Sequence, residues 1–277
     1  MTTSFRPLAL ALAALTTSLS VPLTAQADTA TTEAPASAWT LVGNAGLVSN
    51  YLFRGISVTQ GHPAAQINAE FDHSSGLYVG GFGSGVSNAA YPNGSGTEID
   101  VFAGWRQGFA TDWTADVGVY SYWFPGARYQ ASSTRSVRFD TQELRLGLSR
   151  GSLTAAVWYG LNRYWSGLAV DPSTGELRST QGSTYAELNW NPELATGWTL
   201  NLHAGREMVR HMQVYNFNDY KAGVTYTMGN WQLAGAWNRN TGRASVNGTS
   251  VWSFADADGS VRQGSGSRWT VSAMRGF

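Results

Sequence analysis

Four histidines are the side chains of this chain best suited to acid–base catalysis near neutral pH: His62, His73, His203 and His211. A hydrolase would need one of them beside a nucleophile and an orienting carboxylate or amide. Glu207 or Asp219 could supply a carboxylate, but no pattern in the sequence brings a serine to it. The run Gly83-Ser84-Gly85 lacks the strand-to-helix turn that presents a nucleophilic serine. We therefore expect no enzymatic activity, and a membrane-embedded hydrolase is the least favoured alternative.

Metal-binding residues are also poorly represented. The 277 residues include no cysteine, which excludes thiolate ligands, and His203 and His211 are not at a metal-binding spacing. Asp256, Asp258 and Gly259 resemble part of a calcium-binding loop, but the remaining ligands of such a loop are missing. We expect neither a metal nor another cofactor.

The charged residues instead recur at every second position of short segments. Between Glu98 and Arg106, one face carries Ile, Val, Ala and Trp, and the other carries Glu98, Asp100, Gly104 and Arg106. The segments 143–149 and 199–204 show the same alternation. Successive side chains of a β-strand point to opposite faces, so the pattern predicts strands with one polar and one apolar face.

About twelve such strands are expected, each near the nine to eleven residues with which a tilted strand crosses a bilayer. Their expected bounds are 40–53, 64–73, 77–87, 98–109, 113–124, 141–149, 153–164, 184–190, 198–209, 219–228, 231–240 and 268–277. Tight links alternate with long loops rich in Gly, Ser, Asn and Asp, so all tight turns should lie at one end. The sequence therefore predicts an all-β fold: a single antiparallel transmembrane β-barrel with short periplasmic turns and long extracellular loops.

The composition agrees with strands rather than helices. There are 32 glycines, 12 tryptophans and 12 tyrosines, while only 13% of the residues are charged. The formal net charge is zero and Lys221 is the only lysine, so a basic nucleic-acid-binding surface is not expected. Aromatic residues gather at the expected strand ends, where the membrane interfaces would lie. They are Trp113, Trp190, Trp198 and Trp231 at the turns, and Tyr51, Phe53, Trp123 and Phe124 at the loops.

The beginning of the chain has the three parts of a secretory signal peptide. Arg6 provides a positive start, an apolar run extends from Leu8 to Leu15, and Ala-Gln-Ala ends at Ala27. We expect a signal peptide over 1–27, cleaved after Ala27, and a disordered leader over 28–38. Residues 39–277 would then form the barrel domain in the outer membrane of a Gram-negative bacterial cell.

The last expected strand carries Trp269, Val271, Ala273 and Phe277 on its apolar face. A terminal phenylalanine at the end of an alternating strand is similar to the C-terminal signature of bacterial outer-membrane proteins. This similarity implies that Phe277 is an assembly signal read by the barrel-assembly machinery. Arg275 interrupts the apolar face at a position expected near the membrane interface.

Several segments resemble one family. The run Ser-Asn-Tyr-Leu-Phe-Arg-Gly-Ile-Ser at 49–57, followed by Pro-Ala-Ala-Gln at 63–66, closely resembles the opening of the TorF-family porins of proteobacteria. The resemblance continues at 75–80, 98–104, 116–120, 185–188 and 219–224. Ile67, Asn68 and the long last loop depart from the family pattern. The resemblance implies an outer-membrane porin and transfers no catalytic residue.

If the apolar faces contact lipid, the polar faces line the lumen. The expected pore-lining residues include Glu70, Asp72, Glu98, Asp100, Arg106, Asp116, Tyr120, Glu143, Arg145, Glu187, His203 and Lys221. Acidic residues are in excess, so passive diffusion of small hydrophilic solutes with a weak preference for cations or neutral molecules is expected. The expected partners are these solutes, outer-membrane lipid and lipopolysaccharide.

Two questions stay open at this level. Twelve strands are compatible with a narrow open pore and with a plugged, non-conducting barrel that serves as a receptor, adhesin or structural barrel. Arg54 could be a selectivity residue at the pore mouth, or it could anchor the first loop by pairing with a carboxylate.

Overall fold

The computed structural model describes residues 38–132, 134–246 and 248–277. The expected signal peptide and residues 28–37 of the expected leader lie outside this part of the chain. Within it, the helices are two single 3₁₀ turns, η1 (Trp165–Gly167) and η2 (Gln213–Tyr215). None of the described helices is both long and apolar enough to cross a membrane.

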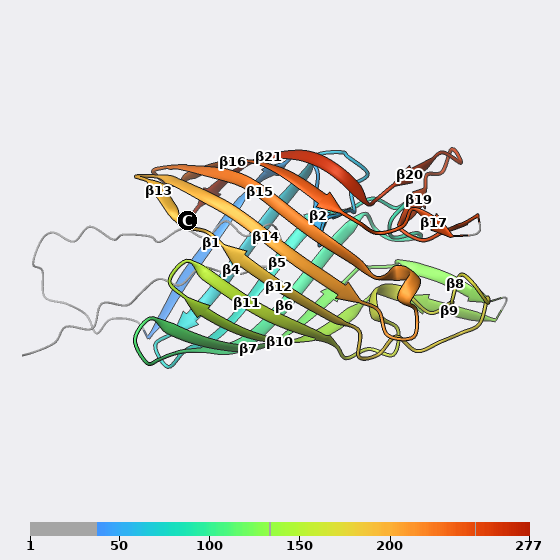
Figure 1. The fold of residues 1–277 in the computed structure, drawn as a ribbon, viewed down its shortest axis with the longest axis horizontal. Helices are drawn as coiled ribbons and strands as arrows, with labels where there is room; N and C mark the ends of the chain where they lie inside the picture. Colours follow the sequence, from blue (N-terminus) through green and yellow to red (C-terminus); the bar gives the residue numbers. More distant parts are fainter. Residues whose placement is uncertain (1–37, 133, 247) are drawn as a thin grey trace, which may run out of the picture.

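Twelve long strands form one closed antiparallel sheet, the barrel wall (Figure 1). They are β1 (Trp39–Val48), β4 (Ala64–His73), β5 (Leu77–Gly85), β6 (Thr97–Phe109), β7 (Trp113–Trp123), β10 (Thr141–Arg150), β11 (Leu153–Gly160), β12 (Thr184–Trp190), β14 (Trp198–Met208), β15 (Phe217–Met228), β16 (Trp231–Asn240) and β21 (Gly266–Gly276). Pairing of β1 with β21 and of β12 with β14 completes the ring. Closure leaves no unpaired sheet edge, which is the condition for a sheet to exist in lipid. The predicted fold class is confirmed.

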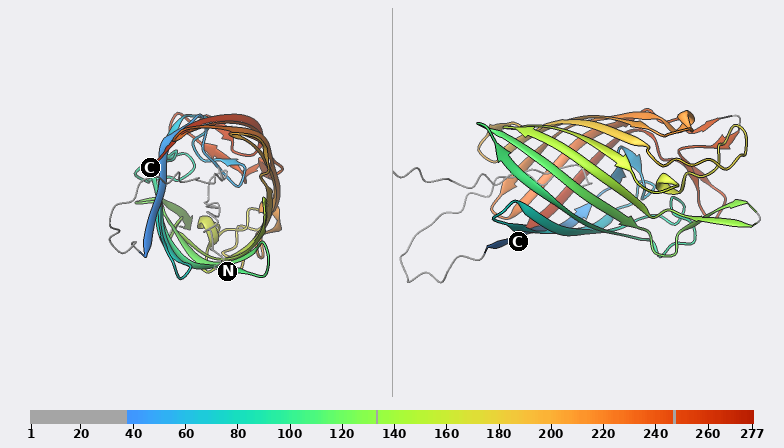
Figure 2. Two further views of the ribbon diagram at one scale, coloured as in Figure 1. Left: turned by 90° about the vertical axis from the view of Figure 1, so that its left-hand side faces the viewer. Right: turned by 90° about the horizontal axis from the view of Figure 1, so that it is seen from below.

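Short strands lie in the links between the wall strands. They are β2 (Leu52–Phe53), β3 (Ile56–Ser57), β8 (Arg128–Ser132), β9 (Arg135–Arg138), β13 (Glu193–Ala195), β17 (Ser245–Val246), β18 (Thr249–Ser250), β19 (Ser253–Ala255) and β20 (Val261–Gln263). All except β13 belong to long loops, which gather at one end of the barrel, while the tight turns gather at the other (Figure 2). We call these the loop end and the turn end. The predicted alternation of tight and long links is confirmed.

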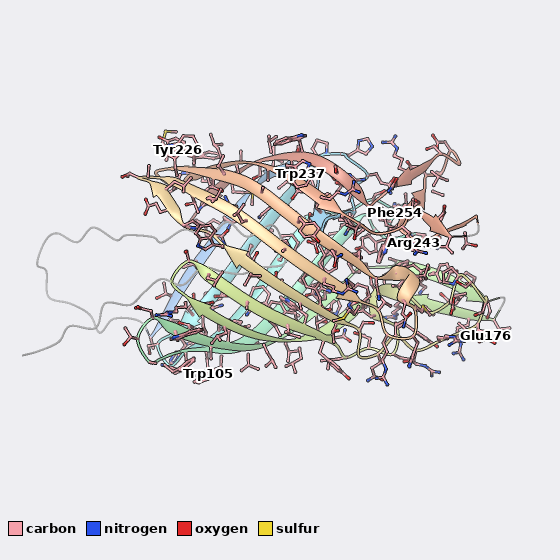
Figure 3. All side chains as sticks on the ribbon, viewed as in Figure 1. Trp105, Glu176, Tyr226, Trp237, Arg243 and Phe254 are labelled. Carbon is pink, nitrogen blue, oxygen red and sulfur yellow. The ribbon has the colours of Figure 1, made fainter. Side chains whose placement is uncertain are left out.

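The two faces of the wall differ as the alternation predicts. On β6, Ile99 and Val101 are 42% and 43% exposed, whereas their neighbours Glu98 and Asp100 are 1% exposed. Large apolar side chains therefore cover the outside of the wall, among them Trp105, which projects outward near the turn end (Figure 3). Buried charges fill the inside, an inversion of the usual soluble protein.

The predicted end of the first strand is wrong, and so is the predicted position of Tyr51, Phe53 and Phe124 at the membrane interface. β1 ends at Val48 rather than continuing to Phe53, and Arg54 and Gly55 then adopt positive φ angles of 48° and 75° that turn the chain back on itself. Leu52–Phe53 and Ile56–Ser57 pair as a hairpin, the β2–β3 hairpin. Tyr51 and Phe124 are buried, and Phe53 is half-buried beside them, so these rings pack inward instead of lying at the membrane interface.

Candidate functional site

The β2–β3 hairpin folds into the barrel instead of extending away from it. Figure 2 shows it within the ring of wall strands. Tyr51 packs against Phe82 of β5, and Phe53 packs against Tyr122 of β7, with ring centroids 5.9 Å apart in both pairs. The hairpin therefore narrows the lumen from within.

Arg54, at the tip of this hairpin, forms two buried ion pairs with the wall. Its guanidinium lies 2.6 Å from Glu143 of β10 and 2.8 Å from Glu207 of β14. The guanidinium also lies 4.2 Å from the ring centroid of Tyr185, and Asn240 donates a hydrogen bond of 2.9 Å to the Arg54 carbonyl. In the structure Arg54 thus anchors the first loop, which is one of its two predicted roles.

A second ionic cluster lies nearer the turn end. Arg106 contacts Glu70 and Asp116 at 3.0 Å each and Asp72 at 3.4 Å. Arg145 contacts the other oxygen of Asp116 at 2.9 Å. Each charge of this cluster is thus close to an opposite charge, which offsets the cost of removing it from bulk water.

Tyr78 reaches this cluster by lying across two glycines of neighbouring strands. Its hydroxyl donates to Asp116 at 3.0 Å. A Cβ atom added at Gly104 of β6 or at Gly118 of β7 would lie 2.3 Å from that hydroxyl oxygen. The missing side chains therefore create the space in which the tyrosine lies flat against the wall.

His203 is held in a third cluster. Its imidazole lies 2.8 Å from Asp219, 2.8 Å from Asn189 and 3.0 Å from the Tyr185 hydroxyl. No serine or threonine hydroxyl bonds to it among the described residues. His211, by contrast, is exposed and lies 2.9 Å from the Ser179 carbonyl.

The remaining members of the predicted pore lining also point inward. Tyr120 is 3% exposed, and Glu187 accepts a hydrogen bond of 2.8 Å from the Trp158 indole. Lys221 is 8% exposed and faces the same lumen region as Glu187 and Asp219. The structure therefore places every side chain of the predicted set inside the barrel.

Glu98 and Asp100 differ from the other buried carboxylates. No arginine, lysine or histidine of the described chain pairs with them, and none of their four carboxylate oxygens has a hydrogen-bond partner. The Tyr51 hydroxyl lies close to Glu98 on this side of the lumen. This acidic pair lies close to the loop end, where β6 begins.

The lumen is divided into a filled half and an emptier half. Aromatic side chains fill the side formed by β5 to β12, namely Tyr78, Phe82, Phe102, Tyr120, Tyr122, Trp158 and Tyr185. The opposite side, from β14 through β1, presents small residues such as Ala234, Ala236 and Ser272, and it leaves a cavity of about 40 Å³ beside Asn50 and Lys221. That space holds only a few water molecules.

Phe82, Phe102 and Trp158 are inward-facing aromatic residues that the sequence did not predict to line the lumen. The signal was available, because Phe102 has the same parity in β6 as Asp100 and Arg106. Because Phe102 is apolar, the prediction of polar lining residues did not include it. A strand facing the lumen thus carries aromatic as well as polar residues.

Phe277 lies on the outer surface next to the first strand. Its backbone N–H donates to the Gly43 carbonyl at 3.0 Å, and a Cβ atom at Gly43 would lie 2.6 Å from its ring. The ring is therefore packed over a glycine at the seam between the first and last strands.

Among the described residues, no group of three acidic or histidine side chains could hold a metal ion.

Comparison with known proteins gives a fold likeness and a family. The structure is similar to the KdgM porin (TM-score 0.48, 7% identity, covering 86% of this chain and 99% of that one). It is also similar to the NanC porin (TM-score 0.49, 9% identity, 85% and 98%) and to a FadL homologue of Pseudomonas aeruginosa (TM-score 0.41, 10% identity, 86% and 89%). No curated protein matches the sequence. Residues 32–260 match the model of Gcw_chp, a family described as bacterial proteins of unknown function, and the chain belongs to that family.

Proposed function

We propose that the protein is an outer-membrane porin-type barrel that lets small cations and small neutral solutes diffuse through a narrow lumen. The apolar outside of the closed wall supports a membrane location, and the polar inside supports a passage for hydrophilic solutes. The resemblance to TorF-family porins supports the same proposal.

The observation that carries the cation preference is the unpaired acidic pair Glu98 and Asp100. Each of the other lumen carboxylates lies near an arginine, a lysine or a histidine. Ionised carboxylates in a confined lumen attract cations and repel anions. We expect the selectivity of the lumen to depend mainly on these two residues.

We expect the width of the lumen to limit the flux of solutes. The β2–β3 hairpin and the aromatic side chains packed around it occupy part of the lumen. We therefore expect a small single-channel conductance, well below that of barrels whose lumen is an open aqueous channel.

A second candidate is a non-conducting barrel that acts as a receptor, adhesin or structural protein. The buried ion pairs of Arg54 favour it, because a hairpin held by two carboxylates can close the lumen completely. The two candidates differ in one measurable property, the current carried by the folded barrel.

The test is current through the purified protein in a planar bilayer under a KCl gradient. The wild type should give discrete ohmic steps and a reversal potential that indicates cation preference. The double variant Glu98→Gln/Asp100→Asn should keep the channel but move the permeability ratio of K⁺ to Cl⁻ towards one. Glu176→Gln, in an exposed loop, is the matched loss of a carboxylate and should leave the ratio unchanged.

Two outcomes would count against the proposal. An unchanged ratio in the double variant, with the channel intact, would remove these residues from the selectivity site. A folded wild-type barrel without current would favour the plugged alternative.

Export and assembly complete the proposal. The sequence features of residues 1–27 support export with cleavage after Ala27, and Phe277 supports recognition by the barrel-assembly machinery. In this orientation the turn end faces the periplasm and the loop end faces the exterior.

A further inference from the structure

The outer face of the barrel wall carries charged side chains of one kind only. In the twelve wall strands, every Asp, Glu and Lys points inward, and the charged residues on the outside are Arg150, Arg206, Arg239 and Arg275. Arg150 and Arg275 lie at the turn end, over the rings of Trp113 and Trp231 at 5.4 and 6.0 Å. Arg206 and Arg239 lie at the loop end, near the ends of β14 and β16.

Arg206 and Arg239 are neighbours across β15. Arg206 pairs in register with Asn218, and Arg239 pairs with Tyr220, two positions further along β15. With strands about 4.8 Å apart and residues about 3.4 Å apart along a strand, their Cα atoms are on the order of 12 Å from each other. Two arginine side chains can reach across this distance to one ligand or to two linked anionic groups.

Both guanidinium groups are exposed and lack an acidic partner. Arg206 donates to the Asn218 side chain at 3.0 Å and Arg239 to the Ser267 hydroxyl at 3.2 Å. Neither forms an ion pair with a carboxylate of the described chain. Neutral partners orient the two groups without neutralising their charge.

Aromatic rings lie beside the two arginines on the same outer face. Tyr220, opposite Arg239, is 42% exposed, and Trp269, opposite Trp237, is 78% exposed. Figure 3 shows Trp237 among the side chains of this part of the wall. Such rings prefer the boundary between hydrocarbon and headgroups, which places Arg206 and Arg239 at the level of the headgroups.

At the loop end, the outward-facing arginines of the wall strands lie in one sector of the barrel. At the loop end, the outward positions of the other wall strands are apolar or uncharged, as at Leu47, Ile99 and Trp123. Arg210, where β14 leaves the wall, is exposed and adds a further positive charge over the same sector. A general attraction to the membrane surface would not require this one-sided arrangement.

We propose that this arginine face, formed by Arg206, Asn218, Tyr220 and Arg239, binds the phosphorylated saccharide headgroup of a glycolipid of the outer leaflet, lipopolysaccharide. Guanidinium groups bind phosphate oxygens with two parallel hydrogen bonds, and the rings below them would pack against the sugar and the first acyl carbons. Free phosphate has the same anionic chemistry, but it would not use the aromatic residues. The inference rests on the proposed outer-membrane location and does not depend on conduction.

The test is a titration of the detergent-purified protein with bisphosphorylated lipid A, with bound lipid counted by native mass spectrometry. Arg206→Gln/Arg239→Gln should weaken binding by about tenfold for each arginine removed. Arg206→Lys/Arg239→Lys should bind with intermediate affinity, because charge is kept and the bidentate geometry is lost. Arg150→Gln removes an outward arginine of the turn end and should bind like the wild type.

Further arms separate the sources of phosphate. Lipid A without its phosphates should bind weakly, and millimolar inorganic phosphate should not displace the lipid. The inference would be overturned if the double glutamine variant bound lipid A like the wild type, if Arg150→Gln lost as much affinity, or if dephosphorylated lipid bound equally well. Displacement by inorganic phosphate alone would mean a simple anion site instead of a glycolipid site. Because the readout is bound lipid, a silent channel would leave this result unaffected.

Discussion

Arg54 and Glu143 are 89 positions apart in the sequence, yet their side chains form an ion pair of 2.6 Å within the barrel. Glu143 also accepts hydrogen bonds from the Trp165 indole and the Tyr122 hydroxyl, at 2.8 and 3.0 Å. The Glu143 carboxylate thus connects the β2–β3 hairpin, the loop between β11 and β12 that carries Trp165, and the wall. The position of the β2–β3 hairpin therefore depends on contacts with several parts of the barrel interior.

Replacement of Arg54 by glutamine should release the hairpin. Loss of one partner of a buried ion pair costs about 3–5 kcal/mol, and here two carboxylates would lose their cation. We expect a larger or more fluctuating single-channel conductance, by about twofold or more, because the hairpin then samples positions away from the wall. Bilayer recordings test this.

The matched control for that variant is Arg243→Gln. Arg243 is an exposed arginine of the last loop, and its loss should leave the conductance unchanged (Figure 3). If Arg54→Gln conducted with the same amplitude and noise as the wild type, the hairpin would not be the constriction.

The Gly118→Ala variant should be less stable, because the new methyl group would lie 2.3 Å from the Tyr78 hydroxyl oxygen. Overpacking of this kind costs about 1–3 kcal/mol. Adding Tyr78→Phe removes the clashing oxygen, so the double variant should recover part of the loss. The free energy of unfolding in urea, followed by tryptophan fluorescence, measures each step of this cycle.

Gly235→Ala is the control for the glycine substitution. An added Cβ at this outward-facing glycine meets no atom within 4 Å, so stability should not fall. Equal losses at Gly235 and Gly118 would show that flexibility, and not the tyrosine contact, explains the effect.

Asp116→Asn should reduce stability more than it alters selectivity. The substitution leaves Arg145 without its ion-pair partner and weakens the contacts of Arg106. The cost is on the order of 3 kcal/mol for an uncompensated buried charge. The temperature at which the folded band disappears in a heat-modifiability gel should therefore fall. Glu176→Gln, which breaks only an exposed pair, should change that temperature little.

Phe277→Ala should lower the amount of folded barrel in cell membranes while leaving refolding in detergent intact. The ring lies outside the lumen, so its removal does not disturb the ionic clusters. Val271→Ala removes an outward side chain of the same strand and should assemble normally. Equal yields for Phe277→Ala and the wild type in membranes would contradict a role in assembly.

Much of the wall follows from local sequence. The bounds predicted for 64–73, 184–190 and 231–240 agree with β4, β12 and β16, because alternating polarity and turn residues are sufficient to define a half-buried strand. The closed antiparallel arrangement follows from the alternation of tight and long links. The inward direction of Asp100, Arg106 and Lys221 follows from parity alone.

Only the tertiary structure determines which side chains contact each other inside the lumen. The partners of Arg54, the absence of a partner for Glu98, and the path of Tyr78 over Gly118 depend on which strands face each other across the barrel and at what stagger. Alternation determines the face on which a side chain lies, but it does not specify the relative height of residues on distant strands. Charge balance inside a closed barrel is set by those heights, and so the unpaired acidic site and the narrow passage could be found only in three dimensions.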